Sequence, residues 1–136
     1  MEKLRALVRF LPDLEKSDFE AGSWVSPQSG PGGVMTMPFT NHSDIVTAFV
    51  DMAYQNVWVR SDFDWPDWAQ TEEAKRLLNE EPALALATSD QLAKLLTVCI
   101  RQDRFVEGAL LDAFESGLVL RIVRRAAALL DAGQAH

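Results

Sequence analysis

Two arginines and two carboxylates lie close together in the segment from residue 101 to residue 108, which reads Arg-Gln-Asp-Arg-Phe-Val-Glu-Gly. If the helix there is continuous, Arg104 lies one turn from both Arg101 and Glu107, and an internal network of ion pairs can fix the angle between two helices. Alternatively, Arg101 and Arg104 grip a carboxylate or phosphate in a bidentate manner, and Glu107 orients it or acts as a base. Gly108 lacks a side chain, so it allows a close approach of a helix.

A second candidate site combines three carboxylates and three aromatic rings in the tract from residue 62 to residue 68, with no cation between them. Aromatic side chains are enriched at protein contacts, so this tract is a candidate docking surface for a basic partner. In the alternative interpretation, the two tryptophans fill the core while the aspartates cap and solvate. The candidate contact residues are Asp62, Asp64, Trp65, Asp67 and Trp68.

Motifs for enzymatic chemistry are missing from the sequence: there is no phosphate loop, dinucleotide fingerprint, serine elbow or zinc spacing. His42 lies in a predicted turn from residue 40 to residue 43, where a solvated or capping role is favoured over catalysis. The tract from residue 62 to residue 68 matches no calcium-binding loop. We therefore expect no metal and no cofactor, and we favour a protein that is not an enzyme.

Composition indicates an acidic globular protein with the size of a single domain, residues 1–136. The net charge of -7 disfavours direct binding to nucleic acid, because it opposes attraction to phosphate. Cys99 has no partner for an internal disulfide and falls on an apolar helix face, which predicts a buried thiol in a reducing compartment. Neither a signal peptide nor a membrane-spanning segment is evident, so we expect a cytoplasmic protein.

The apolar periodicity predicts an α+β fold, mainly helical, with about five helices and a small β-hairpin in the N-terminal third. A first short helix over Leu4–Leu11 ends at Pro12. The segment 45–53 is the predicted central helix, because apolar residues cover most of its circumference. The other helical segments are residues 71–79, 92–100, 105–114 and 118–131.

Turn and cap signals place the remaining elements. The hairpin is predicted from strands over residues 23–26 and 34–37, and a possible third strand covers residues 57–59. Asn41 or Ser43 can cap the helix that follows the hairpin. Thr88 and Gln91 form a capping box, and Gly117 is placed to end a helix in the left-handed conformation.

Several short motifs together resemble a bacterial family known as domain of unknown function 6508. They are Phe63-Asp-Trp-x-x-Trp68, Arg101-x-x-Arg-Phe-x-Glu-Gly108, Phe114-Glu-Ser-Gly117 and Met37-Pro-Phe39. The resemblance covers most of the chain and implies a small bacterial or bacteriophage-associated protein. It brings no activity, cofactor or catalytic residue. If the shared residues mark a site, they nominate Trp65, Trp68, Arg101, Arg104 and Glu107.

Three functions agree with the sequence. The first is a binding or adaptor protein that contacts a protein partner through the acidic aromatic tract. The second is a small-molecule or anion-binding domain, with weak hydrolase chemistry as an option, that uses Arg101, Arg104 and Glu107. The third is a phage-type inhibitor that imitates nucleic acid. The alanines from residue 126 to residue 128 also allow a homodimer contact.

Overall fold

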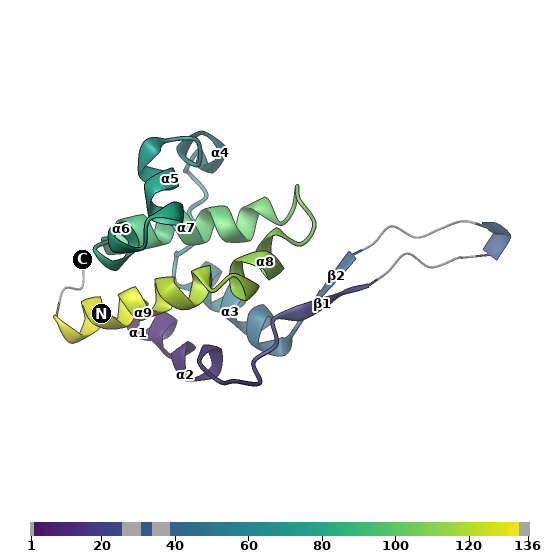
Figure 1. Cartoon of the computed structure of the whole chain (residues 1–136), viewed down its shortest axis with the longest axis horizontal. Helices are drawn as coiled ribbons and strands as arrows, with labels where there is room; N and C mark the ends of the chain where they lie inside the picture. The colour runs from purple at the N-terminus through teal and green to yellow at the C-terminus, as the bar shows by residue number, and fades with distance from the viewer. Residues whose placement is uncertain (1, 26–30, 34–38, 134–136) are drawn as a thin grey trace.

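A computed structural model describes residues 2–25, 31–33 and 39–133 of the chain. Figure 1 shows the helices gathered into one body, with the two strands at one side of it. The predicted α+β, mainly helical fold is confirmed, but there are more helices than the five predicted, because several are only one or two turns long. The helices are α1 (Glu2–Val8), α2 (Leu11–Leu14), α3 (Asp44–Gln55), α4 (Trp65–Trp68), α5 (Glu72–Asn79), α6 (Glu81–Ala85), α7 (Ser89–Gln102), α8 (Ala109–Glu115) and α9 (Leu118–Asp131). The strands are β1 (Gly22–Val25) and β2 (Phe39–His42), and a 3-10 turn covers Pro31–Gly33.

The core is built around α7 rather than around the predicted central segment 45–53. Every residue of α7 from 95 to 100 is buried, and each of the helices α1 to α9 contributes at least one buried apolar side chain to the same cluster. In α3, by contrast, Ala48 is exposed and the buried side chains Val46, Phe49 and Ala53 form one stripe. Helix α3 therefore packs through one face, as an amphipathic helix does.

Cap signals in the sequence predicted several helix ends correctly. The Ser43 hydroxyl accepts from the Val46 amide at the start of α3, so Ser43 and not Asn41 is the cap. The predicted capping box at the start of α7 is present, with reciprocal bonds between Thr88 and Gln91. Gly117 separates α8 from α9 with φ of 87°, the left-handed conformation expected of a helix-ending glycine.

The predicted end of the first helix at Pro12 is wrong. Helix α1 ends at Val8, and Pro12 lies in the first turn of the separate helix α2. Proline is tolerated there because amides of the first turn have no intrahelical acceptor.

The β-hairpin is confirmed, with a different second strand. Strand β1 pairs with β2 antiparallel, and the register places Trp24 opposite Thr40 and Gly22 opposite His42. The predicted second strand over residues 34–37 lies outside the described residues. His42 therefore belongs to a strand and not to the predicted turn.

The predicted third strand over residues 57–59 is wrong, because tertiary contacts decide this segment. It lies in a loop, and Val57 has a positive φ of 58°, which is incompatible with a strand. Trp58 is fully buried, and its indole N–H donates to the Lys3 carbonyl of α1 at 3.0 Å. The carbonyl of Trp58 accepts a hydrogen bond from Thr97 of α7.

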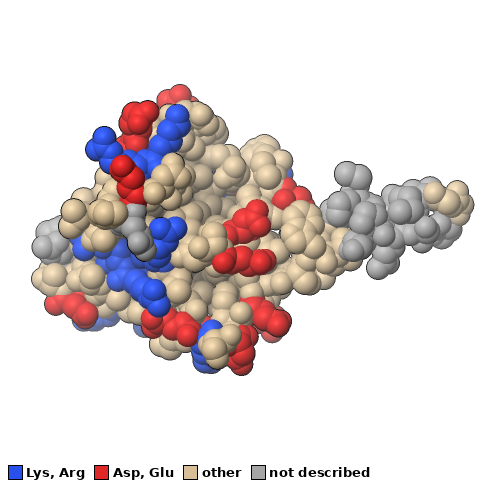
Figure 2. Space-filling model, viewed as in Figure 1, with Lys and Arg blue, Asp and Glu red and all other residues tan. Residues whose placement is uncertain are grey.

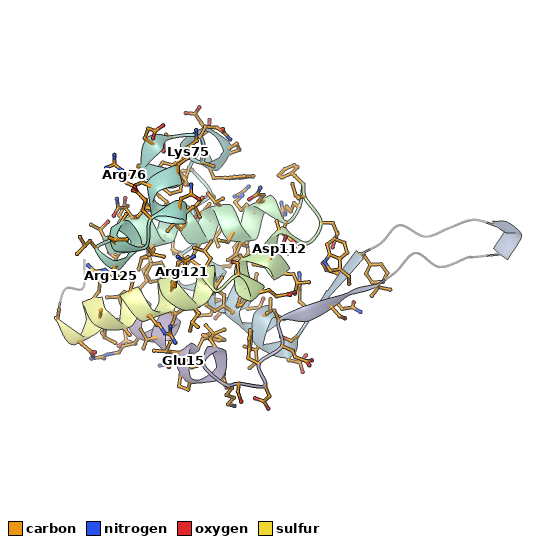
Figure 3. The ribbon with its side chains drawn as sticks, viewed as in Figure 1. Glu15, Lys75, Arg76, Asp112, Arg121 and Arg125 are labelled. Atoms are coloured by element: carbon orange, nitrogen blue, oxygen red, sulfur yellow. The ribbon has the colours of Figure 1, made fainter. Side chains whose placement is uncertain are left out.

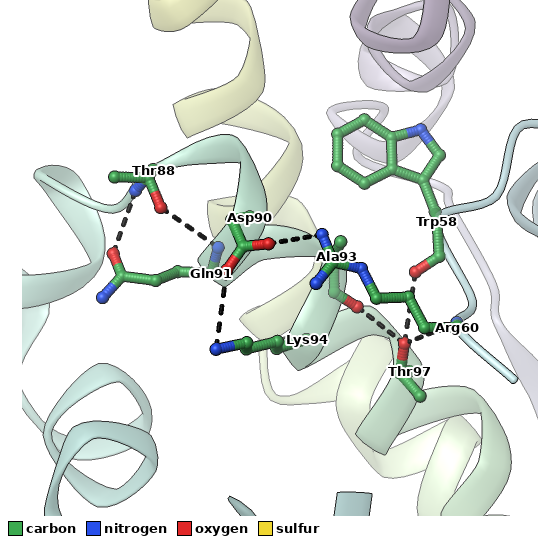
Figure 4. Close-up of polar contacts among 8 residues, drawn as sticks. All are labelled: Trp58, Arg60, Thr88, Asp90, Gln91, Ala93, Lys94 and Thr97. Atoms are coloured by element: carbon green, nitrogen blue, oxygen red, sulfur yellow. Dashed lines mark hydrogen bonds and ion pairs between the residues drawn. The ribbon is translucent and has the colours of Figure 1, made fainter. Parts of the chain in front are cut away.

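Thr97 makes the contact that joins the loop after α3 to α7 (Figure 4). Its fully buried hydroxyl accepts from the Arg60 amide at 3.1 Å. The single hydroxyl proton is shared between the Ala93 carbonyl at 2.8 Å and the Trp58 carbonyl at 3.2 Å. One threonine thus satisfies polar groups from both elements inside the core.

An ion-pair network lies beside this contact on the protein surface. The Arg60 guanidinium donates to the Asp90 carboxylate, and Lys94 lies 3.5 Å from the second oxygen of Asp90. The hydrogen bond from Arg60 is the main cause of the lowered pKa of Asp90.

Among the described residues, no helix has the length and apolar character needed to cross a bilayer.

Cys99 is buried as predicted, and burial raises the pKa of its thiol to about 12. The thiol therefore stays protonated at neutral pH.

Replacing Thr97 tests this account of the core. Thr97→Val keeps the shape of the side chain but leaves the Arg60 amide without an acceptor, so we expect a loss of about 1–3 kcal/mol in the free energy of unfolding. Thr97→Ser keeps the hydroxyl and is the matched control. Urea unfolding of both variants measures the difference, and a valine variant as stable as the serine variant would contradict the role given to the hydroxyl.

Candidate functional site

The loop between α7 and α8 carries most of the segment that the sequence analysis singled out. Helix α7 ends at Gln102 and α8 begins at Ala109. The helix predicted over residues 105–114 therefore begins four residues later in the structure than in the prediction. Phe105 and Val106, predicted to lie in a helix, are 76% and 51% exposed. The loop therefore presents two large apolar side chains to the surroundings.

One face of the hairpin lies against this loop. Successive side chains of a strand point to opposite faces, so Thr40 and His42 share a face of β2. Trp24 is the register partner of Thr40 and joins them on that face. Each of these three residues contacts a residue between 103 and 108.

The contact of Glu107 with Thr40 is the first of the three. One carboxylate oxygen of Glu107 accepts from the Thr40 amide at 2.9 Å and from the Thr40 hydroxyl. These two hydrogen bonds lower the pKa of Glu107 below its ordinary value. Glu107 is thus occupied by the hairpin and not by the neighbouring arginines.

The contact of Gly108 with Trp24 is the second, and it leaves no room for a side chain on Gly108. Gly108 has a φ of 90°, and a Cβ atom placed on it would lie 2.2 Å from Cζ2 of the Trp24 indole. A side chain here would meet both a strained backbone and the ring. The close approach predicted for Gly108 is real, but its neighbour is a strand and not a helix.

His42 and Asp103 form the third contact, beside a cavity of about 220 Å³ between β2, α3 and α7. Nε2 of His42 lies 3.9 Å from Oδ2 of Asp103 and has no hydrogen-bond partner among the described residues. This separation exceeds hydrogen-bond length. Oδ1 of Asp103 accepts from the Leu110 amide at 3.1 Å and holds the start of α8.

The aromatic tract meets the loop through one ring contact. The centroids of Trp65 and Phe105 lie 6.1 Å apart, which is within the range of aromatic pairs. Trp68 is different: it is only 8% exposed, and its indole N–H donates to Glu73 at 2.8 Å. Of the two tryptophans, Trp68 fills the core and Trp65 is only partly buried.

The three aspartates of the tract also divide by role. The Asp64 carboxylate accepts from the Asp67 amide at 3.1 Å and caps α4, as the structural interpretation of the tract expected. Asp62 and Asp67 are exposed, and neither carboxylate forms an ion pair with any described residue. These two charges are free to meet a partner.

The predicted network of Arg101, Arg104 and Glu107 does not form among the described residues. The helix is interrupted at residue 102, so the spacing of three no longer places these side chains along one face. Arg104 is exposed, Arg101 is partly buried, and no ion pair joins either to Glu107.

We call the four apolar side chains that lie on or against this loop the aromatic surface: Trp24, Trp65, Phe105 and Val106. Trp65 and the loop were found from the sequence, whereas Trp24 was not. Thr40, which holds the loop through Glu107, and His42, which faces Asp103, were also not recognised as neighbours of the loop. Their signal was the alternation of side chains along a strand, which requires the strand register to be known.

One family model matches nearly the whole chain. Residues 1–132 match the model described as "Family of unknown function (DUF6508)", so the chain belongs to this family, as the resemblance indicated. No curated protein and no solved structure matches the chain.

Two glycines with nearly the same backbone provide a matched test of the contact with Trp24. At Gly117, with φ of 87°, an added Cβ meets nothing within 4 Å, so Gly117→Ala should lose only the conformational cost of about 1–2 kcal/mol. Gly108→Ala should lose more and should also shift the Trp24 indole resonance. Urea unfolding and NMR spectra of both variants measure this, and equal losses with an unmoved indole would refute the close contact.

The Glu107 contact should weaken in acid. Because the folded pKa of Glu107 is lowered, its stabilisation is complete above the ordinary value of 4.5 and is lost as the pH falls through the lowered folded value. The Thr40 amide resonance should therefore titrate below pH 4.5. In Glu107→Gln, we expect this titration to disappear, which separates Glu107 from the nearby His42 and Asp103. An amide that titrates identically in both proteins would show that Glu107 is not its acceptor.

Proposed function

We propose that this chain is a non-enzymatic protein-binding domain that uses the aromatic surface to hold a basic segment of a partner protein. The observation that carries the proposal is the exposure of Phe105 and Val106 in a loop that is itself tied to the hairpin. This retains the acidic aromatic tract as part of the contact and moves the centre of the contact to the loop between α7 and α8.

The grouping of apolar side chains around this loop adds to the support that their exposure gives. Single exposed apolar residues are normal on soluble proteins, whereas adjoining ones mark interaction sites. Trp24 is half exposed and lies on Gly108, while Phe105 forms a ring pair with Trp65. Tryptophan and phenylalanine are also enriched where proteins meet.

Charge determines the chemistry of the partner. Asp62 and Asp67 are exposed near Trp65, and the chain carries a net charge of -7. Arg104 in the loop offsets part of this negative charge. A partner segment with lysine or arginine beside an apolar side chain complements both features, because opposite charges favour encounter and apolar contact stabilises the complex.

Preorganisation gives the loop an advantage in binding. Two hydrogen bonds from Thr40 to Glu107, the Trp24 contact at Gly108 and the Asp103 bond to Leu110 hold the loop before any partner arrives. Less conformational freedom is then lost on association.

Catalysis has weaker support in this geometry. The nearest arrangement to a catalytic pair is His42 with Asp103, and their 3.9 Å separation exceeds the hydrogen bond that orients a catalytic base. Glu107, proposed from the sequence as a base or orienting group, is engaged by Thr40.

Selection from a displayed library of random peptides tests the proposal with a defined readout. Enriched peptides should combine lysine or arginine with an aromatic or aliphatic residue. Phe105→Ser should weaken their binding by about tenfold or more, as expected for a central apolar contact. Leu86→Ser is the matched control, since Leu86 is 77% exposed and Phe105 76% exposed. The affinity of this variant for the enriched peptides should stay within about twofold of that of the unchanged protein.

The paired variant Asp62→Asn with Asp67→Asn isolates the electrostatic part. It should slow association and reduce the dependence of the rate on salt, while dissociation changes less. Enrichment of acidic peptides, or binding that Leu86→Ser weakens as strongly as Phe105→Ser, would overturn the proposed surface.

A further inference from the structure

A second hollow lies at the other end of the helical body, between α6 and α9. It has a volume of about 210 Å³ and combines an apolar lining with arginines. Figure 2 shows a group of Lys and Arg atoms on this face of an otherwise acidic protein, and Figure 3 labels Arg121 and Arg125 on α9. The lining residues are Leu84, Ala85, Arg121, Arg124, Arg125 and Ala128.

The three arginines are not equivalent. Arg124 is neutralised by Glu15, whose carboxylate accepts from its Nη2 at 3.0 Å and its Nε at 3.2 Å. Arg125 donates from Nε to the Ala87 carbonyl at 2.8 Å, which anchors the side chain and leaves its charge uncompensated. The Arg121 guanidinium forms no ion pair or hydrogen bond with any other described residue.

Arg121 and Arg125 are four residues apart on α9, so they are neighbours on the helix surface. Like charges at this spacing destabilise a helix, and an anion between them removes the repulsion. Both side chains are partly buried, which strengthens their electrostatic interaction with any bound charge. The pair therefore has donors and positive charge available for a ligand.

The apolar part of the lining indicates a second property of the ligand, besides its negative charge. Leu84 and Ala85 from α6 and Ala128 from α9 give the hollow a wall with no polar side chain. An apolar cavity of about 150 Å³ is large enough to hold a benzene ring, and this hollow is larger. A ligand that fills it needs an apolar body as well as an anionic group.

We propose that this hollow binds a small carboxylic acid with an apolar body, such as an aromatic acid. The carboxylate lies between Arg121 and Arg125, because guanidinium groups bind carboxylates in a bidentate manner. The apolar body lies against Leu84, Ala85 and Ala128. This site is separate from the aromatic surface and does not depend on the proposed function.

Titration of the whole chain with three probes tests the proposal, followed by NMR or calorimetry. Benzoate supplies both features, benzyl alcohol supplies the ring without the charge, and inorganic phosphate supplies the charge without the ring. Benzoate should bind saturably with a Kd of about 1 mM or lower. The other two probes should bind about tenfold more weakly or worse.

Arg121→Gln is the primary variant, because Arg121 has no partner among the described residues whose loss would disturb the fold. It should weaken benzoate binding by about tenfold or more. Arg104→Gln is the control, since Arg104 also forms no ion pair with a described residue but lies in the loop between α7 and α8. Benzoate binding by this variant should stay within about twofold.

Three results would overturn the assignment. The first is benzoate that does not saturate below about 10 mM. The second is phosphate that binds as tightly as benzoate, which would show that the apolar wall plays no part. The third is binding that Arg104→Gln weakens and Arg121→Gln does not, which would place the anion at the other end of the molecule.

Discussion

The aromatic surface depends on residue 108 being a glycine. Because no Cβ is present, the Trp24 indole lies directly on the backbone of the loop, and the left-handed φ of 90° turns the chain into α8. Thr40 and Glu107 then join the same two elements by hydrogen bonds. Segments more than 60 residues apart in sequence become one surface, with charge and apolar area side by side.

Much of the helical fold could be predicted because its signals are local. The reciprocal bonds of Thr88 and Gln91 and the cap at Ser43 each lie within three residues of their partners, and the sequence displays both residues together. The failed strand at residues 57–59 has the opposite cause. Trp58 is held by Lys3 and Thr97, which are 55 and 39 residues away, so these tertiary contacts override the β propensity of the flanking valines.

Some residues of the candidate site could likewise be predicted from local sequence, and others could not. Clustering of unusual residues pointed to the loop from 101 to 108 and to Trp65, and the structure brings the two segments together at Phe105. The predicted arginine network failed because the helix end at Gln102 is not marked by a glycine or proline. Trp24 was missed because its position depends on the hairpin register, which no pattern along one strand contains.

The most direct measurement of the central claim is the NMR contact between the Trp24 ring and the backbone of Gly108 in the whole chain. Our account predicts a nuclear Overhauser effect from the Trp24 Hζ2 proton to the Gly108 Hα protons, and Hα resonances displaced by the ring current of the indole. Gly108 resonances at random-coil positions, with no cross-peak to Trp24, would contradict it, because the hairpin and the loop would then not form a common surface.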